Sequence, residues 1–478
     1  MEPDFLVVLN LLPFKGNCRA FIFNLSQSFA INYEWSFPNE AGPHGSKVKH
    51  ALTDARHFLF LQGPHGPFFY ELSRLLQAAG HKVCRIGINR GDRHYWPDRA
   101  TYEAYLGEMD DWETHLSDYL DRHSITDVVV YGDTRPIHDT AKALARARGI
   151  RIHCFEEGYL RPYWITYERD GANGNSRLMD LSMAEISALI DQPDAAQPEA
   201  PAQWGAIWRH IFYGSIYHAN ILFRNASYPN FKSHRAEGVF QEWMLHCKRL
   251  LVHPFGLIQR RWSTAQLMRL GAPYHVALLQ LGHDASVQDH SPMRSMEEFI
   301  DATVAGFAVG APGHHQLVFK AHPLEDGREP VQQLVEAAAS DHGISDRVWF
   351  IQGGKLGPLL DRASSAITVN STAGQQALWR GLPLKAFGRA VYSRPEFVSD
   401  QPLADFFAKP TMPDQGAYRL YRQFLLETSQ VGGGYYSADG RRIAKRRVVD
   451  LMLSDCDIYD IDGRKKVTPA AKLSVVSG

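Results

Sequence analysis

The chain has 478 residues, of which 45% are hydrophobic and 22% charged, with a formal net charge of −1. This length predicts two or three domains, and the composition is that of a globular protein rather than a disordered one. A nearly neutral chain gives no indication of a nucleic-acid partner.

The amino terminus lacks both the basic start and the small-residue cleavage site of a secretory signal. No run reaches the roughly 18 apolar residues that can span a bilayer. The five cysteines show no CxxC spacing, which favours a reducing compartment and argues against structural zinc. We therefore expect a cytoplasmic protein.

Residues 1–52 lack sustained periodicity and predict a poorly ordered N-terminal extension. Beyond them, short apolar runs alternate with helical patterns. We expect strands at 57–61, 82–86, 127–131 and 150–154, and helices at 68–79 and 137–148. This alternation predicts a parallel, doubly wound sheet with the loops after its strands on one edge. Residues 53–191 are therefore assigned to a Rossmann-like domain that holds the acceptor and the catalytic group.

A Pro/Ala-rich linker and an aromatic, basic helical segment follow at 192–262. A second α/β pattern then predicts strands at 275–279, 316–320, 348–351 and 366–369, and helices at 296–309, 331–339, 356–362 and 372–380. We assign 263–400 to a Rossmann-like nucleotide-binding domain and 401–478 to helices and a tail. Two such domains predict an α/β, GT-B-like fold with its site in the cleft between them, although fold alone does not determine function.

Glu156 and Glu157 come directly after the apolar run 150–154 and before Gly158. The carboxyl ends of strands are where open α/β sheets bind ligands. Because successive strand residues point to opposite faces, only one of the two carboxylates can enter a given pocket. The other would support the turn or face Arg161. The alternative is a surface turn with two solvated acids.

Lys320 is the last residue of the strand expected at 316–320, and His322 follows two residues later. A cation and an imidazole at this end of a strand can bind a phosphate group. The alternative is a His-Pro turn with a surface lysine.

Asn370, Ser371 and Thr372 connect a strand to a helix. There they would cap the helix and leave its open amides as an anion site, the alternative being capping alone.

Gln280 and Asp284 follow the first strand of the second domain, where they could hold a ribose hydroxyl or a cytosine amine. The alternative is an ordinary polar loop. No metal-ligand spacing occurs within the domain patterns, and neither a P-loop nor a G-x-S-x-G motif is present. Neutralisation of a leaving phosphate would then depend on side chains and a helix end.

Five motifs, at 62–69, 131–138, 155–162, 320–323 and 370–374, resemble the KpsS/LipB-type capsular polysaccharide proteins in identity and order. The resemblance covers roughly residues 55–400. It implies a retaining β-Kdo transferase of GT-B fold, with CMP-Kdo as donor and no metal or other cofactor. It also implies a phosphatidylglycerol-type lipid acceptor at the inner membrane and other capsule assembly proteins as partners.

Carried over by position, the resemblance places the nucleophile on Glu157, where related enzymes have the aspartate of a Glu-Asp-Gly motif. Glu156 and His322 are the other catalytic candidates. The expected nucleotide and phosphate ligands are Lys320, His322, Asn370, Ser371, Thr372, Gln280 and Asp284. The expected substrate ligands are His65, Asp133, Arg135 and Arg161, of which Arg135 or Arg161 would pair with the carboxylate of Kdo.

Two other functions remain open. A nucleotide-sugar epimerase shares the fold and much of a phosphate site, and a non-catalytic capsule-export component would not need Glu157. The segment 204–262, rich in aromatic and basic residues, predicts docking to the cytoplasmic face of the inner membrane. Its alternative is an interdomain helical pair whose aromatics form core.

Overall fold

The computed structural model describes residues 55–161, 164–190, 207–232, 244, 265–267, 269, 271–282, 291–322, 325, 329–352 and 355–460. The chain divides by its contacts into Met1–Thr53 and Asp54–Gly478, and all the described residues lie in the second unit. The prediction for residues 1–52 lies outside the described residues.

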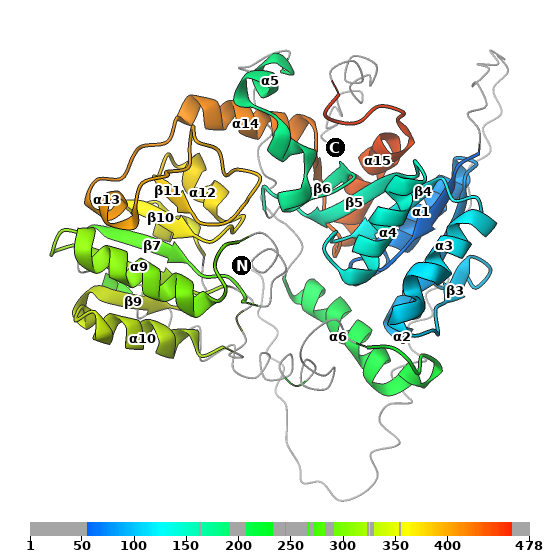
Figure 1. Ribbon diagram of the computed structural model, residues 1–478, viewed down its shortest axis with the longest axis horizontal. Helices are drawn as coiled ribbons and strands as arrows, with labels where there is room; N and C mark the ends of the chain where they lie inside the picture. The colour runs from blue at the N-terminus through cyan, green and yellow to red at the C-terminus, as the bar shows by residue number, and fades with distance from the viewer. Residues whose placement is uncertain are drawn as a thin grey trace, which may run out of the picture. The chain divides into compact units, whose positions relative to one another are not determined.

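The first sheet has the strand order β12-β6-β5-β4-β1-β2-β3 (Figure 1). Its strands are β1 (His57–Phe60), β2 (Lys82–Gly87), β3 (Tyr102–Ala104), β4 (Asp127–Tyr131), β5 (Arg151–Glu157), β6 (Trp164–Arg169) and β12 (Gln430–Gly432). Strands β1 to β5 pair in parallel, whereas β6 and β12 pair antiparallel. The prediction of a parallel sheet is therefore wrong at this edge, because β5 turns back directly into β6.

Both faces of the first sheet are covered, because its strands are apolar on both sides. Phe58 and Phe60 of β1 belong to one apolar cluster, whereas Leu59 and its neighbour Leu61 belong to another on the opposite face. The associated helices are α1 (Phe68–Ala78), α2 (Arg90–His94), α3 (Trp112–Arg122), α4 (Pro136–Ala147), α5 (Met183–Ala188) and α6 (Ile207–Arg224). This burial of both faces explains the continuous hydrophobic runs of the sequence.

The second sheet is entirely parallel, with the order β11-β10-β7-β8-β9. Its strands are β7 (Tyr274–Leu278), β8 (Gln316–Lys320), β9 (Val348–Ile351), β10 (Ser365–Thr368) and β11 (Leu384–Ala386). Its helices are α9 (Met296–Gly310), α10 (Val331–Asp341), α11 (Gly357–Leu360), α12 (Gly374–Trp379) and α13 (Leu403–Ala408). The predicted α/β class, with two Rossmann-like sheets in succession, is confirmed.

After the second sheet the chain returns to the first. Helix α14 (Gln415–Glu427) leads to β12, which pairs with β6, and α15 (Ala438–Leu453) follows (Figure 1). Arg441 of α15 donates from Nε to Glu71 Oε1 of α1 at 3.0 Å. The C-terminal segment is thus part of the first sheet and its covering layer. This return brings residues beyond 430 to the carboxyl end of β5.

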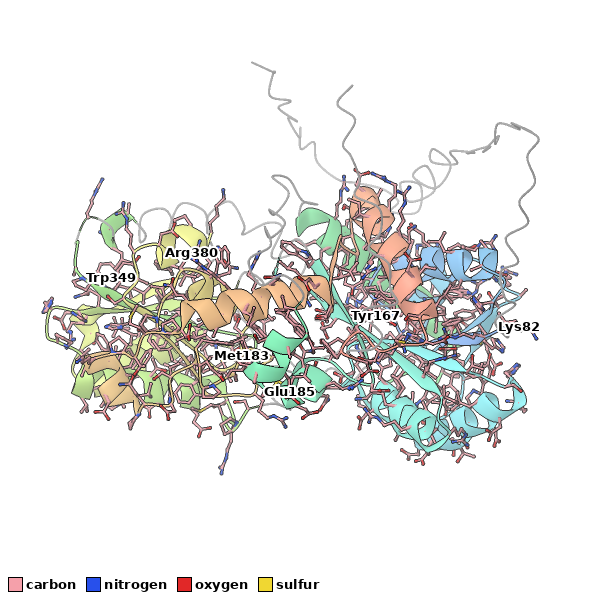
Figure 2. All side chains as sticks on the ribbon, turned by 90° about the horizontal axis from the view of Figure 1, so that it is seen from above. Lys82, Tyr167, Met183, Glu185, Trp349 and Arg380 are labelled. Carbon is pink, nitrogen blue, oxygen red and sulfur yellow. The ribbon has the colours of Figure 1, made fainter. Side chains whose placement is uncertain are left out.

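A buried ionic group lies at the opposite edge, where β4 begins. Asp127 is fully buried and accepts hydrogen bonds from Arg56 Nε at 2.9 Å and Arg151 Nε at 3.1 Å, and bonds His153 Nε2 at 2.9 Å. Arg56 also donates to the Met452 carbonyl at 2.8 Å, which ties the end of α15 to the sheet. The other ring nitrogen of His153 bonds the hydroxyl of Tyr167, a buried residue of β6 labelled in Figure 2. This group holds the fold together away from the candidate site.

Candidate functional site

Glu156 and Glu157 are the last two residues of β5, at the carboxyl end of a strand as the sequence predicted, and the alternative of a surface turn is wrong. They stay in the strand because the antiparallel partner β6 pairs Glu156 with Thr166 and Glu157 with Ile165. Strand β4 ends opposite Phe155, so the two glutamates extend beyond their parallel neighbour. Hydrogen bonds to β6 therefore fix the backbone conformation of both glutamates, and their side chains lie at the carboxyl edge of the sheet.

The carboxylate of Glu157 is held by two tyrosine hydroxyls. Its Oε1 accepts hydrogen bonds from Tyr131 at 3.0 Å and from Tyr436 at 3.1 Å. Among the described residues, no hydrogen-bond donor reaches its second oxygen, Oε2. Burial, together with the Glu157 carboxylate, raises the pKa of both tyrosines well above the usual range, so both phenols remain proton donors. This arrangement orients one carboxylate oxygen and leaves the other available for a reaction partner.

The adjacent carboxylate, Glu156, serves the backbone of this edge. Its Oε1 accepts from the Glu157 N–H at 2.9 Å, and its Oε2 accepts from Asn173 Nδ2 at 3.4 Å. The contacts of the two carboxylates are with different residues, as expected for neighbours on opposite faces of a strand. Glu156 is thus placed to support the end of the strand, which is the role the sequence reasoning gave to one member of the pair.

Two of the predicted substrate ligands, Asp133 and Arg135, lie in the loop after β4. Arg135 donates from Nη1 to Gln62 Oε1 at 2.6 Å. Asp133 is 1% exposed, and its Oδ2 accepts from Asn175 Nδ2 at 3.1 Å and lies 3.5 Å from Lys142 Nζ. Its Oδ1 has no hydrogen-bond partner within the described part of the chain. A buried carboxylate oxygen in this state is costly unless a ligand or water supplies a donor.

Gly132, the first residue of that loop, has φ +71°, a conformation that favours glycine. A Cβ built there would lie 3.6 Å from Arg135 Nε and 3.7 Å from Glu156 Oε2. The loop after β4 therefore brings a guanidinium and a carboxylate to the same place.

The other two predicted substrate ligands differ in setting. His65 stacks on Tyr217 of α6 with 4.3 Å between ring centroids. Arg161 is exposed in the turn between β5 and β6, and the structure places no described residue in hydrogen-bond contact with it. The structure thus brings together Glu156, Glu157, Asp133 and Arg135, with His65 near them through α6, and leaves Arg161 at the periphery.

A second group lies at the carboxyl edge of the second sheet. Lys320 ends β8, is 5% exposed and donates from Nζ to the Ala321 carbonyl at 3.0 Å. His322 follows and is half-buried. Asp284, predicted beside them, lies outside the described residues.

Gln280 and Asn370, two of the predicted nucleotide ligands, bond to each other. Gln280 Nε2 donates to Asn370 Oδ1 at 2.9 Å, and its Oε1 accepts from the Asn370 N–H at 2.9 Å. Both are nearly fully buried. These reciprocal bonds link the loops after β7 and β10, so each side chain orients the other at this edge of the sheet.

The predicted cap at Ser371 and Thr372 is also wrong. Helix α12 begins at Gly374, and its N-cap residue, Ala373, makes no side-chain cap bond. Ser371 Oγ instead accepts from the Ala373 N–H at 3.2 Å, while the Ser371 N–H donates to Thr368 Oγ1 at 3.3 Å. The chain therefore forms a turn before the helix that two side-chain hydroxyls stabilise. The backbone N–H groups of Ser371 and Ala373 are the ones bonded in this turn.

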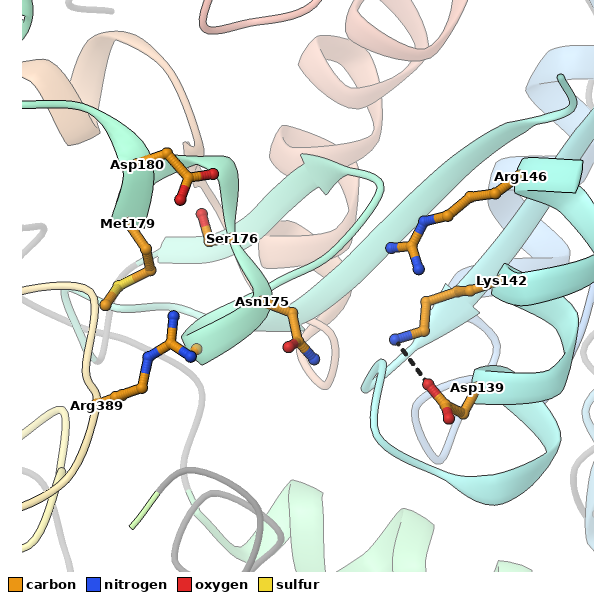
Figure 3. Close-up of a pocket in the computed structure, with 9 residues that line it drawn as sticks. Asp139, Lys142, Arg146, Asn175, Ser176, Met179, Asp180 and Arg389 are labelled. Carbon is orange, nitrogen blue, oxygen red and sulfur yellow. Dashed lines mark ion pairs between the residues drawn. The ribbon is translucent and has the colours of Figure 1, made fainter. Parts of the chain in front are cut away.

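A polar cavity of about 330 Å³ lies beside α4 (Figure 3). Lys142 and Arg146 extend from α4 toward Asn175, and Arg389, which follows β11, enters from the opposite side. Lys142 lies 3.3 Å from Asp139 and Arg146 donates to the Asp170 carbonyl, so both already have partners. None of the residues predicted from the sequence lines this cavity.

The sequence reasoning missed several residues that touch the candidate site. Tyr131 and Gln62 lie inside the recognised motifs, but only their identities, not their contacts, were visible. Tyr436, Asn173 and Tyr217 lie in segments without any motif. No pattern of spacing could have found them, because each reaches the site through a tertiary contact.

Within the described ranges, no three His, Cys, Asp or Glu side chains gather as metal ligands do. None of the helices in those ranges combines the length and apolar character needed to cross a bilayer.

Two curated proteins resemble this chain along most of its length. It is 29% identical to the capsule polysaccharide export protein KpsS of Escherichia coli over 388 residues, which are 80% of this chain and 98% of that protein. It is 30% identical to the capsule polysaccharide modification protein LipB of Neisseria meningitidis over 403 residues, 82% of this chain and 94% of that protein.

Among solved structures, a β-Kdo 2,7-transferase of Thermosulfurimonas dismutans KpsC aligns with 83% of this chain and 100% of its own, at 12% identity and a TM-score of 0.39. A UDP-GlcNAc 2-epimerase of Neisseria meningitidis aligns with 84% of this chain and 100% of its own, at 13% identity and a TM-score of 0.27. These TM-scores are too low to carry an argument about fold or activity.

The family model described as "Capsule polysaccharide biosynthesis protein" matches residues 126–436, which include Glu157, both tyrosines that bond it, and the second sheet. With this match and the two curated relatives, the chain belongs to the capsule polysaccharide biosynthesis protein family.

Proposed function

We propose that this chain is a retaining glycosyltransferase that moves Kdo from CMP-Kdo to a phosphatidylglycerol-type lipid at the start of a capsule linker. The observation that carries the proposal is the Glu157 carboxylate, which two tyrosine hydroxyls hold by one oxygen at the carboxyl end of β5. The other oxygen is the candidate nucleophile. Kdo and the lipid acceptor enter the proposal through the motif resemblance and the chemistry of the site residues.

In the first step, the bond from the anomeric carbon of Kdo to the phosphate oxygen breaks, and CMP leaves with the electron pair. Glu157 Oε2 bonds that carbon as the oxocarbenium-like centre develops. In the second step, an acceptor hydroxyl attacks the same carbon, releases its proton to water and displaces the carboxylate, which leaves with the electron pair of its bond to the sugar. Two inversions restore the original anomeric configuration.

In this proposal, separate side chains would bind the phosphate and the carboxylate of the donor. Lys320 ends β8 and His322 follows it, and in this proposal they would stabilise the charge on departing CMP. Arg135 has five N–H donors, of which one is used by Gln62, so it can still form a bidentate pair with the carboxylate of Kdo.

The test incubates the purified chain with CMP-Kdo and a phosphatidylglycerol-type acceptor and detects a Kdo-lipid by mass spectrometry. NMR of the product should show the anomeric configuration of the donor, and the yield should not change in EDTA. A parallel incubation with UDP-N-acetylglucosamine tests for epimerase activity. Epimerised UDP-sugar without Kdo-lipid would favour the epimerase, and the absence of both products would favour a non-catalytic export component.

Lys320→Ala and His322→Ala are each expected to weaken CMP binding and to slow donor cleavage. A hydrogen bond to a charged group contributes about 1.5–3 kcal/mol, which corresponds to roughly ten- to hundredfold in affinity. Calorimetric titration with CMP measures the effect. Arg347→Ala is the matched control. It also removes a cation from this part of the chain, but the Arg347 guanidinium donates to the backbone carbonyls of His315 and Pro312. Unchanged CMP affinity in both variants would exclude a phosphate site here.

We also propose that α6 and the segment after it bring the protein to the inner membrane. On α6, Tyr217 is buried, whereas Phe212 is 51% and Phe223 is 68% exposed. The aromatics of this helix therefore divide between buried and exposed positions, and docking through the exposed ones stays a prediction. Other residues of the predicted docking segment, including Arg260 and Arg261, lie outside the described residues.

Replacing Phe212 and Phe223 together by serine should reduce sedimentation with phosphatidylglycerol liposomes by roughly tenfold or more, since a fully buried Phe side chain contributes about 1.5–3 kcal/mol. Val309→Ser on α9, where the valine is 81% exposed, controls for loss of surface hydrophobicity. If the double variant binds like the wild type, or the wild type does not bind, α6 has no role in membrane docking.

A further inference from the structure

Tyr217 of α6 occupies the centre of a buried polar network beneath the candidate site. The residue is 4% exposed, and its hydroxyl accepts hydrogen bonds from Gln62 Nε2 at 2.7 Å and from Asn89 Nδ2 at 2.8 Å. It donates to Asp92 Oδ1 at 3.3 Å. A hydroxyl has one proton and two lone pairs, so this geometry uses its full capacity.

The directions of these bonds are determined by their surroundings. Asp92 accepts from Arg85 Nη2 at 3.0 Å and from the Ile88 N–H at 3.1 Å, so it acts as an acceptor toward Tyr217 as well. Asn89 uses its Oδ1 to accept from the Asp92 N–H at 2.9 Å, which turns its amide donor toward Tyr217. With one lone pair accepting from Asn89 and the proton directed to Asp92, the Tyr217 oxygen presents its remaining lone pair to Gln62.

This constraint sets the orientation of the Gln62 amide. With Nε2 directed to Tyr217, Oε1 faces the opposite way and accepts from Arg135 Nη1 at 2.6 Å. If the Gln62 amide were flipped, its NH₂ group would face the N–H groups of Arg135, and neither side would have an acceptor. The guanidinium in turn lies over the Tyr131 ring at 5.6 Å, and the Tyr131 hydroxyl bonds Glu157. Tyr217 also stacks on His65, so one residue contacts or aligns two predicted substrate ligands.

We propose that Tyr217 is a positioning residue for donor recognition: it orients Gln62 so that the amide carbonyl holds Arg135 in place for a sugar carboxylate. The inference rests on the proposed function and deepens it, because it makes α6 part of the selection of carboxylate-bearing donor sugars. Packing alone would be satisfied by phenylalanine, which has the same ring but cannot orient Gln62. Preorganisation of a long, flexible arginine lowers the entropic cost of binding the anion.

Tyr217→Phe tests this role against Tyr228→Phe as a matched control. Tyr228 is also 4% exposed, and its hydroxyl bonds only the Tyr102 hydroxyl at 2.8 Å among the described residues. The expected result is a rise of about tenfold in KM for CMP-Kdo with little change in kcat for Tyr217→Phe, as for the loss of one oriented hydrogen bond. The control should leave KM unchanged although it loses a similar amount of stability.

A double variant shows whether Tyr217 acts through Gln62. If it does, Gln62→Leu and Tyr217→Phe will raise KM no more together than Gln62→Leu does alone. Fully additive effects would overturn the proposal.

A measurement without substrate separates this inference from the proposed function. The Nη1–H NMR signal of Arg135, identified by its loss in Arg135→Lys, should exchange with solvent faster in Tyr217→Phe than in Tyr228→Phe. If the wild type transfers no Kdo, the proposed function fails while this signal still reports on the positioning of Arg135. Equal exchange in both variants would overturn the role of Tyr217.

Discussion

Glu157→Gln is expected to lower Kdo transfer by about 10³-fold or more, because an amide cannot trap the anomeric carbon as a covalent adduct. Its shape is that of the native side chain, and its carbonyl oxygen can still accept from Tyr131 and Tyr436. The fold, the CMP affinity and the thermal midpoint should therefore stay close to those of the wild type. The rate of Kdo-lipid formation is the measurement, with CMP binding by calorimetry as the check on folding.

Glu156→Gln is the matched control, since the same change is made one residue away on the other face of β5. Its carbonyl oxygen can keep the bond from the Glu157 N–H, so only a modest loss is expected. Full turnover by Glu157→Gln would remove the nucleophile assignment. Inactivity confined to Glu156→Gln would move the role by one residue.

Tyr436→Phe measures how much the orientation of Glu157 matters. Loss of one of its two hydrogen bonds should reduce kcat by about tenfold and leave CMP affinity unchanged.

Asp127→Asn is expected to destabilise the protein by about 3–5 kcal/mol, although Asp127 lies far from the reaction in the fold, at the amino end of β4. The change leaves the buried Arg56 guanidinium without its counter-charge, and breaking a buried ion pair on one side has a cost of this size. The contact of Arg56 with Met452 would be weakened too, so α15 should loosen from the sheet. Urea unfolding at neutral pH measures the loss. Asp121→Asn, which breaks an exposed pair with Arg148, should leave the urea midpoint nearly unchanged.

The same group predicts the acid sensitivity of the fold. Burial lowers the pKa of His153 to about 4, below its value of about 6.5 in the unfolded chain, so unfolding takes up a proton between those values. Stability should therefore fall as the pH falls from about 6.5 to about 4. Burial alone would raise the pKa of Asp127, but bonds from His153 and Arg56 hold it well below its usual range. Its contribution is present above about pH 4 and is lost as the pH falls further, a loss that Asp127→Asn should lack.

A stability that stays constant from pH 7 to pH 4 in the wild type would contradict this account.

Local patterns in the sequence determined the alternation of strands and helices. The apolar runs at 316–320 and 348–351 coincide with β8 and β9, because a strand buried in a parallel sheet needs a short run of apolar residues bounded by breakers. The same logic located Glu156 and Glu157 at the carboxyl edge of β5. The sequence alone also carried the motifs by which the family can be recognised, since they need only identity and order along the chain.

Tertiary structure alone decided which side chains meet. Tyr436 bonds Glu157 across 279 positions of the chain, because β12 pairs with β6 and carries the residues after it to the site. Gln280 and Asn370, separately predicted as ligands, bond to each other across two loops. Such contacts leave no periodic signal, because a hydrogen bond depends on where two distant segments lie in space and not on the residues that flank either of them. The local chemistry of the strand ends was therefore readable from sequence, whereas the partners that orient it depended on the return of the chain to the first sheet.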